Sequence, residues 1–457
     1  MFDYTMNSTG VPLDALSAII PGTTIPNSAQ PAFFLGLIVV LFCNFSTTYN
    51  HPVLPYLRLA SAVPAYYACW LYGFSGRFQL LNRSVALGMA LLGTYGGLKV
   101  TEICVVGFWN KEGDWPKWIR LRSQQERKAG LSKKEKQKGM RGMGNVVQFE
   151  PTLFGRLVYA HDLGSASGSS WIAGRVWDWA PASMRDQDPT PKSRWEFGFT
   201  SLRKLVECYL VVDVCESILS TRDWDFYTPN ARPVTAAGIP LAWQFVYSLC
   251  VCVRTAMDIT FPFLVFGLAS SLLANTPSTA FAPLFDAPFT SASLAEFWSV
   301  RWHPIFRRSF DRISAGVLSF AICISGGSFT KQSRGAKVLR SIIIFTLSCT
   351  EHLILFSALP TDAQYPAQPF LDTQAFKFFL AQPLGLTIEF LLVQPLTEGL
   401  PRSWRTAARR AFAWAWLLWS GRYFSDIWFN RGLLAHKERN IVFSPVRGLL
   451  RGQWRID

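Results

Sequence analysis

Long apolar stretches separated by short polar segments dominate the chain. No Lys, Arg, Asp or Glu occurs from Ala15 to Leu57, and residues 32–45 form the apolar centre of that stretch. A helix of about 20 apolar residues spans the hydrocarbon core of a bilayer and satisfies its own backbone there. Further candidate spans are residues 59–76, 84–98, 202–219, 240–253, 259–274, 313–325, 341–359, 378–396 and 411–429. The pattern predicts an all-α, polytopic helical membrane protein with roughly seven to ten transmembrane helices.

The composition agrees with this class. Hydrophobic residues make up 50% of the 457 residues and charged residues only 16%, whereas a soluble domain carries about 25% charged residues. A chain this apolar would collapse, which excludes intrinsic disorder. Nine cysteines are too sparse for a scaffold built on disulfides. The net charge of +15 predicts an anionic partner, such as the headgroups of a lipid bilayer or a phosphorylated substrate.

One polar segment interrupts the pattern. From Lys111 to Arg141 the chain carries eleven Lys or Arg and four Asp or Glu, most densely in residues 133–138. Loops rich in Lys and Arg stay on the cytoplasmic side of a membrane. Residues 109–195 are therefore predicted to form a polar, basic and irregular cytosolic insert within a single membrane domain, residues 1–457. We expect this loop to rest on anionic headgroups and do not expect a nucleic-acid partner.

No metal site is expected from the cysteines or from three of the five histidines. All nine cysteines lie in apolar runs, and none forms a Cys-x-x-Cys pair. We therefore expect them to be small buried hydrophobic residues. His51 lies in a turn, His161 in a polar loop and His436 in a basic tail, so we expect all three to be solvated. No metal and no tightly bound cofactor is predicted.

Two ionisable residues lie next to each other inside an apolar run. Glu351 and His352 fall within residues 341–359, and an ionisable residue at membrane depth is by default a functional candidate. Residues four apart share a helical face, so His352 lies over Ser348, whereas Glu351 points elsewhere. Two interpretations are open. The pair forms interhelical hydrogen bonds that hold the bundle together, or a neutral imidazole accepts a proton from an alcohol.

Another histidine lies in a segment that is both aromatic and basic. Its notable residues are Trp298, Arg301, Trp302, His303, Arg307, Arg308 and Arg312. Trp298 and Trp302 are predicted to share one helical stripe, and Glu296 and Arg301 are a candidate ion pair. Such a segment is typical of a membrane interface with snorkelling arginines. Alternatively, the Trp-His dipeptide lines a cavity and the arginines bind phosphate.

Several short motifs follow one another along the C-terminal half. They are Pro283-Leu284-Phe285 with Pro288, residues 293–298, Arg301-Trp302-His303 and residues 348–352, with weaker motifs at residues 209–213, 378–382, Glu389 and residues 419–422. Together they resemble the wax-synthase-like branch of the membrane-bound O-acyltransferases, and within it the fungal O-acetyltransferases of terpenoid and meroterpenoid secondary metabolites. Cys349 stands where that family usually has Gly. The motif-bearing catalytic half is predicted to be residues 283–430.

The resemblance implies acyl transfer from acyl-CoA, as co-substrate, to an alcohol inside a helical bundle with an internal tunnel. Carried over by position, His352 would be the general base on the acceptor hydroxyl. His303 would be its partner, which orients substrate or stabilises the thioester oxygen. The further predicted substrate-binding residues are Trp298, Arg301, Trp302, Ser348 and Glu351. From charge alone, the residues expected to meet the phosphates of coenzyme A are Arg307, Arg308 and Arg312.

The identity of the acceptor is argued from weaker features. The polar insert and the aromatic richness favour transfer of an acetyl group from acetyl-CoA to a hydroxyl of a hydrophobic terpenoid-type metabolite. Long-chain wax or sterol ester synthesis is the alternative. A second alternative is a transporter in which intramembrane ionisable residues, including Asp213 and Asp258, relay protons. The expected location is the endoplasmic reticulum membrane, because the donor is cytosolic and the acceptor apolar.

Overall fold

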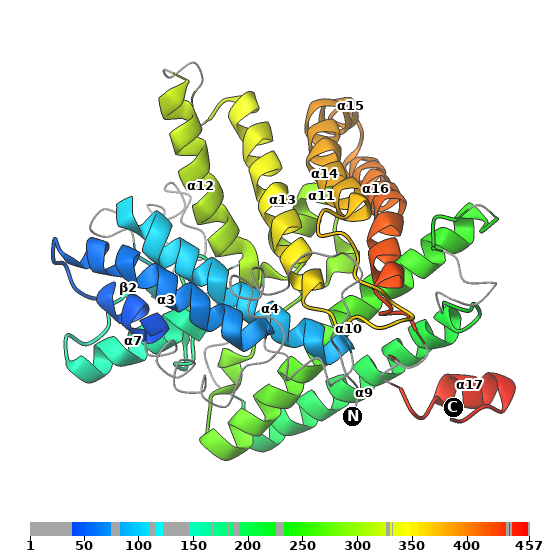
Figure 1. Ribbon diagram of the computed structural model, residues 1–457, viewed down its shortest axis with the longest axis horizontal. Helices are drawn as coiled ribbons and strands as arrows, with labels where there is room; N and C mark the ends of the chain where they lie inside the picture. Colours follow the sequence, from blue (N-terminus) through cyan, green and yellow to red (C-terminus); the bar gives the residue numbers. More distant parts are fainter. Residues whose placement is uncertain are drawn as a thin grey trace.

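The protein is mostly helical, as Figure 1 shows for the computed structural model. The structure describes residues 39–74, 83–109, 115–121, 146–165, 169–180, 182–185, 192–224, 233–236, 238–325, 330, 332–435, 438 and 441–455. The prediction of a predominantly helical protein is confirmed. Residues 32–38 of the first candidate span, the lysine-rich centre of the insert and His436 lie outside the described residues.

Nine helices of more than ten residues are described. They are α3 (Leu54–Phe74), α4 (Arg83–Val100), α7 (Leu153–Ser165), α9 (Arg194–Leu219), α10 (Leu241–Ala274), α12 (Arg307–Ile324), α13 (Arg334–Ser357), α14 (Thr373–Ile388) and α16 (Arg402–Asn430). Shorter helices are α8 (Ala182–Arg185), α11 (Leu294–Glu296), α15 (Gln394–Thr397) and α17 (Pro445–Arg451). Three segments are π-helical: η3 (Thr101–Val105), η7 (Phe297–Arg301) and η9 (Glu389–Val393). Four are 3-10 turns: η4 (Val106–Trp109), η5 (Ser278–Ala280), η6 (Pro288–Thr290) and η8 (Pro304–Phe306).

The number of membrane spans differs from the expectation. Four segments in the described ranges are long and apolar enough to cross a membrane: Arg83–Trp109, Leu241–Ala274, Arg334–Ser357 and Thr373–Thr397. The predicted count of roughly seven to ten spans is therefore not confirmed. Residues 240–253 and 259–274, predicted as two spans, belong to the single 34-residue helix α10. Arg254 and Asp258, which lie between the two predicted spans, face each other one helical turn apart, with Nε and Oδ2 at 3.5 Å.

The long helices pack in pairs around a common core. α9 packs along α10, α3 along α4, and α13 along α14, while both α10 and α14 contact α16. Figure 1 shows α9 and α10 beneath the upright helices α12, α13, α14 and α16. The largest hydrophobic cluster includes Val251, Leu353, Phe379 and Ile427, one each from α10, α13, α14 and α16. This cluster fixes the helices that surround the site described below.

The insert contributes a small sheet that the prediction of an all-α fold did not include. β1 (Trp118–Arg120) pairs antiparallel with both β2 (Val146–Val147) and β3 (Arg175–Trp177), so that β1 is central. Trp118 and Trp177 are buried with Tyr159 of α7 in a second hydrophobic cluster that also contains Ile103 of η3. The described part of residues 109–195 is thus packed onto the membrane helices rather than irregular throughout.

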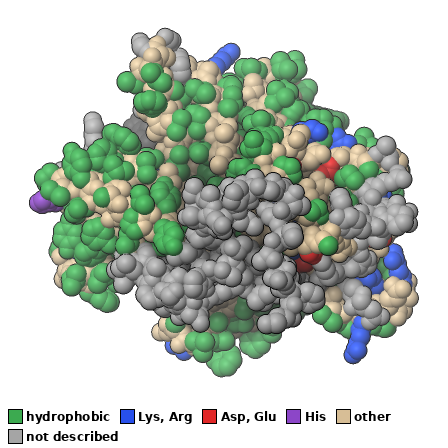
Figure 2. Space-filling view, viewed as in Figure 1, with side chains coloured by type: hydrophobic (Ala, Val, Ile, Leu, Met, Phe, Trp, Pro, Cys, Tyr) green, Lys and Arg blue, Asp and Glu red, His purple; other side chains and the backbone are tan. Residues whose placement is uncertain are grey.

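The outer surface is largely apolar. Exposed large hydrophobic side chains include Phe199 of α9, Leu273 of α10, and Phe320 and Ile324 of α12. In Figure 2 hydrophobic side chains cover the left and upper parts of the face, and basic side chains lie mainly at its margin. Cys323 of α12 is exposed on this surface, which differs from the burial expected for the cysteines. An apolar patch of this extent suits contact with lipid or with another apolar partner.

Candidate active site

The Arg-Trp-His motif lies where a short helix ends in a strained loop. Trp302 has an extended backbone and ends the π-helix η7. It still contacts Trp298, with ring centroids 6.3 Å apart and the rings steeply inclined, although the predicted regular helical stripe is absent. His303 follows with φ of 28°, a left-handed conformation that residues with a Cβ rarely adopt. Such strain persists only where the surrounding structure fixes the backbone.

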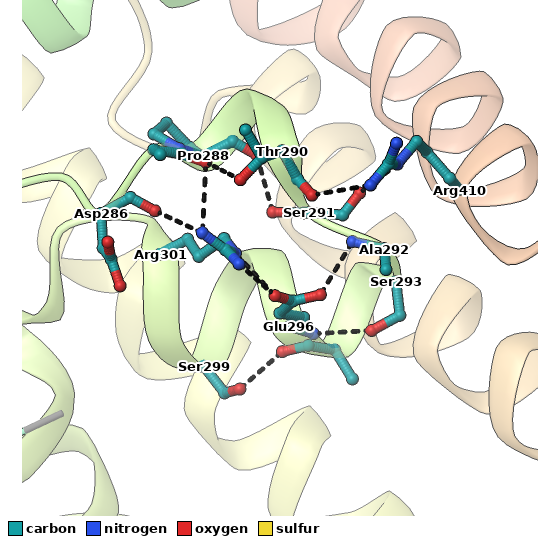
Figure 3. Close-up of polar contacts among 12 residues, drawn as sticks. Asp286, Pro288, Thr290, Ser291, Ala292, Ser293, Glu296, Ser299, Arg301 and Arg410 are labelled. Carbon is teal, nitrogen blue, oxygen red and sulfur yellow. Dashed lines mark hydrogen bonds and ion pairs between the residues drawn. The ribbon is translucent and has the colours of Figure 1, made fainter. Parts of the chain in front are cut away.

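Arg301 joins this loop to the segment before it (Figure 3). Its guanidinium lies 2.6 Å and 2.7 Å from Glu296 Oε1, which confirms the predicted ion pair. Arg301 Nη1 also donates to the Asp286 carbonyl at 3.0 Å, and the Asp286 amide donates to the Arg301 carbonyl at 2.9 Å. Asp286 precedes Ala287, which has φ of 43°. Arg301 therefore connects two strained positions, and its role in substrate binding stays a prediction.

Groups from distant helices hold the beginning of the same segment. Glu389 of η9 is only 1% exposed and accepts hydrogen bonds from the amides of Leu294 at 2.7 Å and Ala295 at 2.9 Å. Arg410 of α16 donates to the carbonyl of Thr290 at 3.1 Å, as Figure 3 shows. The first amides of a helix lack intrahelical partners, so a carboxylate at that end satisfies them. Glu389 thereby fixes the start of α11, the short helix that precedes the Arg-Trp-His motif.

A buried amide links three helices behind Trp298. Gln382 of α14 is fully buried, and its Oε1 accepts from Trp298 Nε1 at 3.2 Å. Its Nε2 donates to Ser420 Oγ of α16 at 3.1 Å. Residues 378–382 and 419–422, both weak motifs in the sequence, therefore meet at one hydrogen-bond network. Neither Gln382 nor Glu389 was predicted as a site residue, although polar side chains within apolar runs were the available signal.

His352 lies on the regular helix α13. Its Nδ1 is 2.8 Å from the carbonyl oxygen of Ser348, one turn earlier. A carbonyl only accepts hydrogen bonds, so Nδ1 carries the proton and Nε2 keeps its lone pair. The rings of Phe379 and Phe424 enclose the imidazole, at centroid distances of 4.5 Å and 6.2 Å. This tautomer can accept a proton at Nε2 from a bound alcohol.

Both histidines line one cavity of about 420 Å³. Its volume lies in the range of roughly 300–1,000 Å³ that is typical of small-molecule sites. Burial, and to a smaller extent the nearby His352, lower the pKa of His303 to about 3. His303 is therefore neutral at physiological pH. The other predicted site residues that line the cavity are Trp298, Trp302, Arg307, Ser348 and Glu351.

The three arginines predicted to meet coenzyme A occupy different environments. Arg307 is exposed and lines the cavity. Arg308 is an ion-pair partner of the buried Glu102, with Nε and Oε1 at 2.5 Å. Glu102 also accepts from Ser309 Oγ at 2.7 Å, so this pair attaches the start of α12 to η3. Arg312 is partly buried on α12. Binding of phosphate by these residues stays a prediction.

The acidic residues considered for a proton relay have local partners. Asp213 is fully buried and accepts from Ser444 Oγ at 2.5 Å and from the Val446 amide at 2.8 Å, so it caps α17. Asp258 faces Arg254 within α10. His51 and His161 are exposed as expected, but His161 belongs to α7 rather than to a loop. In the part of the chain that the structure describes, no group of three or more His, Cys, Asp or Glu side chains could hold a metal ion.

Comparison with known proteins gives one family match and one curated relative. Residues 281–380 match the sequence model of the membrane bound O-acyl transferase family, and this range contains both His303 and His352. The O-mevalon transferase yanI of Aspergillus niger is 22% identical over 272 residues, which cover 54% of this chain and 58% of that protein. The chain thus spans somewhat more than half of the length of this relative. The resemblance to membrane-bound O-acyltransferases is confirmed.

Proposed function

We propose that this chain is a membrane-embedded O-acyltransferase that transfers an acyl group from acyl-CoA to a hydroxyl of a hydrophobic acceptor. The observation that carries the proposal is the pair of histidines in one apolar cavity, with Nε2 of His352 available as a base. The family match, which includes both residues, supports the reaction class. We further propose acetyl-CoA as donor, a terpenoid-type acceptor and the endoplasmic reticulum membrane as location.

The proposed reaction is a direct transfer between two substrates. The acceptor oxygen attacks the thioester carbonyl while Nε2 of His352 removes its proton. The new C–O bond forms, the C–S bond breaks, and the proton passes from the imidazolium to the leaving thiolate of coenzyme A. A neutral His303 keeps one ring N–H, which can donate to the oxyanion of the tetrahedral intermediate. Because the thioester is already reactive, alignment of the two substrates supplies much of the rate.

The other predicted residues take roles consistent with their positions. Trp298 and Trp302 form apolar walls against the acceptor, and Ser348 and Glu351 are polar groups at the cavity surface. Arg307 is the exposed guanidinium at the cavity and is proposed to meet the phosphates of coenzyme A. We propose that Arg301 positions the loop that carries His303. Arg308 and Arg312 are proposed to contribute to the positive electrostatic field around the site.

The cavity walls bear on the choice of acceptor. Aromatic rings surround His352 and His303, and rigid aromatic walls suit a compact polycyclic alcohol. A long-chain wax or sterol ester synthase remains the alternative within the same reaction class. The local partners of Asp213 and Asp258 favour the acyltransferase over a transporter with a relay through these residues.

Transfer of labelled acyl groups in microsomes tests the proposal. Membranes containing the unchanged protein, His352→Ala or His161→Ala are incubated with labelled acetyl-CoA or palmitoyl-CoA and a panel of polycyclic and fatty alcohols. A mevalonyl thioester belongs among the donors, because the related A. niger protein is named as an O-mevalon transferase. We expect labelled esters of polycyclic alcohols from the unchanged protein and from His161→Ala, but not from His352→Ala. Esters formed only from palmitoyl-CoA would favour the alternative, and equal labelling by His352→Ala would contradict the proposed base.

A further inference from the structure

The cavity contains a buried carboxyl group that the proposed transfer does not use. Glu351 is 7% exposed and lines the cavity. Leu355, one turn further along α13 on the same face, packs against Ala90 of α4, so the carboxyl group faces α4. Among the described residues, however, Glu351 Oε1 has no hydrogen-bond partner. A buried polar atom without a partner is unfavourable, so Oε1 is a natural acceptor for a donor that arrives with a ligand.

Glu351 and His352 face different parts of the same cavity. Successive helical residues are separated by about 100° around the helix axis. His352 packs against aromatic rings of α14 and α16, whereas Glu351 shares the face of α13 that packs against α4 through Leu355. The α4 side of the cavity is formed by Ser84, Leu87, Gly88 and Leu91. It is open at Gly88, where an added Cβ would meet no atom within 4 Å.

Glu351 has no position in the proton transfer itself. The Nδ1–H of His352 already donates to the Ser348 carbonyl, so the imidazole is oriented by its own helix and not by a carboxylate. Glu351 lies on the face of α13 that packs against α4 instead. We therefore expect the unpaired Oε1 of Glu351 to contribute to binding of the acceptor and not to deprotonation of the acceptor hydroxyl.

We propose that the α4 side of the cavity is a second acceptor subsite, in which Glu351 Oε1 accepts a hydrogen bond from a second hydroxyl of the acceptor. This inference rests on the proposed function and names the acceptor class: a rigid, apolar diol. One hydroxyl reacts at His352 while the other binds Glu351. A mono-alcohol leaves Oε1 buried without a partner, and sites built to bind a hydroxyl reject analogues that lack it.

Matched alcohols test the subsite directly. Saturated steroid and decalin skeletons are supplied in pairs, each as a mono-alcohol and as the diol of the same skeleton. We expect the unchanged protein to show a kcat/KM about tenfold or more higher for the diol of a pair. Glu351→Leu should remove most of this preference. Glu351→Gln should retain most of it, because the amide oxygen still accepts a hydrogen bond.

A second variant acts on the same space without touching the carboxyl group. Gly88→Leu places bulk on the α4 side and should also reduce the diol preference. Gly335→Leu is its matched control, since Gly335 likewise has open space around a Cβ but does not line the cavity. The amount of each variant in the membrane is measured in parallel, so that poor folding is not mistaken for lost selectivity.

The outcomes separate the subsite from the reaction. Equal kcat/KM for the two members of every pair in the unchanged protein would overturn the second subsite. So would a diol preference that persists in both Glu351→Leu and Gly88→Leu, or an equal loss of turnover for mono-alcohol and diol in Glu351→Leu. If the unchanged protein acylates no alcohol with any donor, the failure lies in the proposed acyl transfer, on which the subsite depends.

Discussion

The two histidines line one cavity but are held there in different ways. His352 belongs to the regular helix α13, and its ring is oriented by a carbonyl one turn away. His303 lies in a loop with positive φ, and the segment before it is fixed by Glu296, Arg301 and Glu389. The helix-borne histidine thus depends on its own helix. The loop-borne histidine depends on a local ion pair and on Glu389, a group from a distant part of the chain.

This difference separates chemical effects from positional ones. Loss of the His352 side chain removes the base but leaves the hydrogen bonds of α13 intact. Loss of Glu389 removes no group from the cavity, yet it releases the start of α11, the short helix that leads to the loop of His303. Variants of the two kinds should therefore differ in how turnover, KM and stability respond.

The largest expected effect is that of His352→Ala. Removal of a general base typically costs roughly 10²–10⁴-fold in rate, and we expect kcat to fall by this factor with little change in the amount of protein in the membrane. The measurement is ester formation per unit of protein in microsomes. His161→Ala, at an exposed position of α7, is the matched control. A loss smaller than about tenfold would contradict the role of His352 as base.

The next effect is expected from Glu389→Leu. The buried amide of Leu294 and the part-buried amide of Ala295 lose their acceptor, and a buried amide left unsatisfied costs about 1–3 kcal/mol. We expect the Arg-Trp-His segment to be displaced, so that kcat/KM falls by roughly 10–100-fold. The apparent Tm should fall as well, because the folded state has lost two hydrogen bonds.

Glu389→Gln separates positioning from general disruption. Its amide oxygen can still accept one of the two hydrogen bonds, so its activity should lie between those of the unchanged protein and Glu389→Leu. Glu398→Gln, on an exposed residue nearby, should behave as the unchanged protein. If Glu389→Leu lowers the Tm but leaves kcat/KM intact, His303 does not depend on this contact.

A smaller effect is expected from Arg301→Lys. A lysine keeps the charge but cannot bind the Glu296 carboxylate and the Asp286 carbonyl with one planar group. The loop should loosen around His303 without disruption of α11. We expect kcat to fall by about tenfold, with KM for the acceptor changed less, and steady-state kinetics over acceptor concentration measure the two separately. An equal rise in KM with unchanged kcat would instead indicate a direct role of Arg301 in substrate binding.

The same contrast explains what could be predicted from the sequence. His352 stood out because an ionisable residue interrupts an apolar helix, and the ion pair of Glu296 with Arg301 is local. The contact between Leu294 and Glu389 joins residues 95 positions apart, which no helical periodicity reveals. The strands β1, β2 and β3 have only two or three residues, too few to show an alternating pattern. Predicted spans 240–253 and 259–274 were divided by charges that pair with each other inside α10.

The smallest effect on activity is expected from Asp162→Asn. This variant tests whether the position of His303 also depends on the packing of the insert. Asp162 of α7 is 1% exposed and accepts from Trp118 Nε1 at 2.6 Å, Ser170 Oγ at 2.8 Å and the Trp171 amide at 2.7 Å. An asparagine turns an NH₂ group toward one of these donors, so at least one hydrogen bond is lost. We expect a destabilisation of about 1–3 kcal/mol, seen as a lower apparent Tm in detergent.

The effect of Asp162→Asn on turnover should be less than about threefold if the insert is a separate hydrophobic cluster. This hydrophobic cluster is connected to the cavity through η3. Ile103 of η3 belongs to the cluster, and the neighbouring Glu102 binds Arg308 at the start of α12. Arg308 lies five residues after His303, so a large loss of kcat in Asp162→Asn would show that the loop-borne histidine is positioned through this ion pair as well. In that case Glu102→Gln should reproduce the loss of kcat, whereas the proton-accepting geometry of His352, fixed within α13, should be unaffected by either variant.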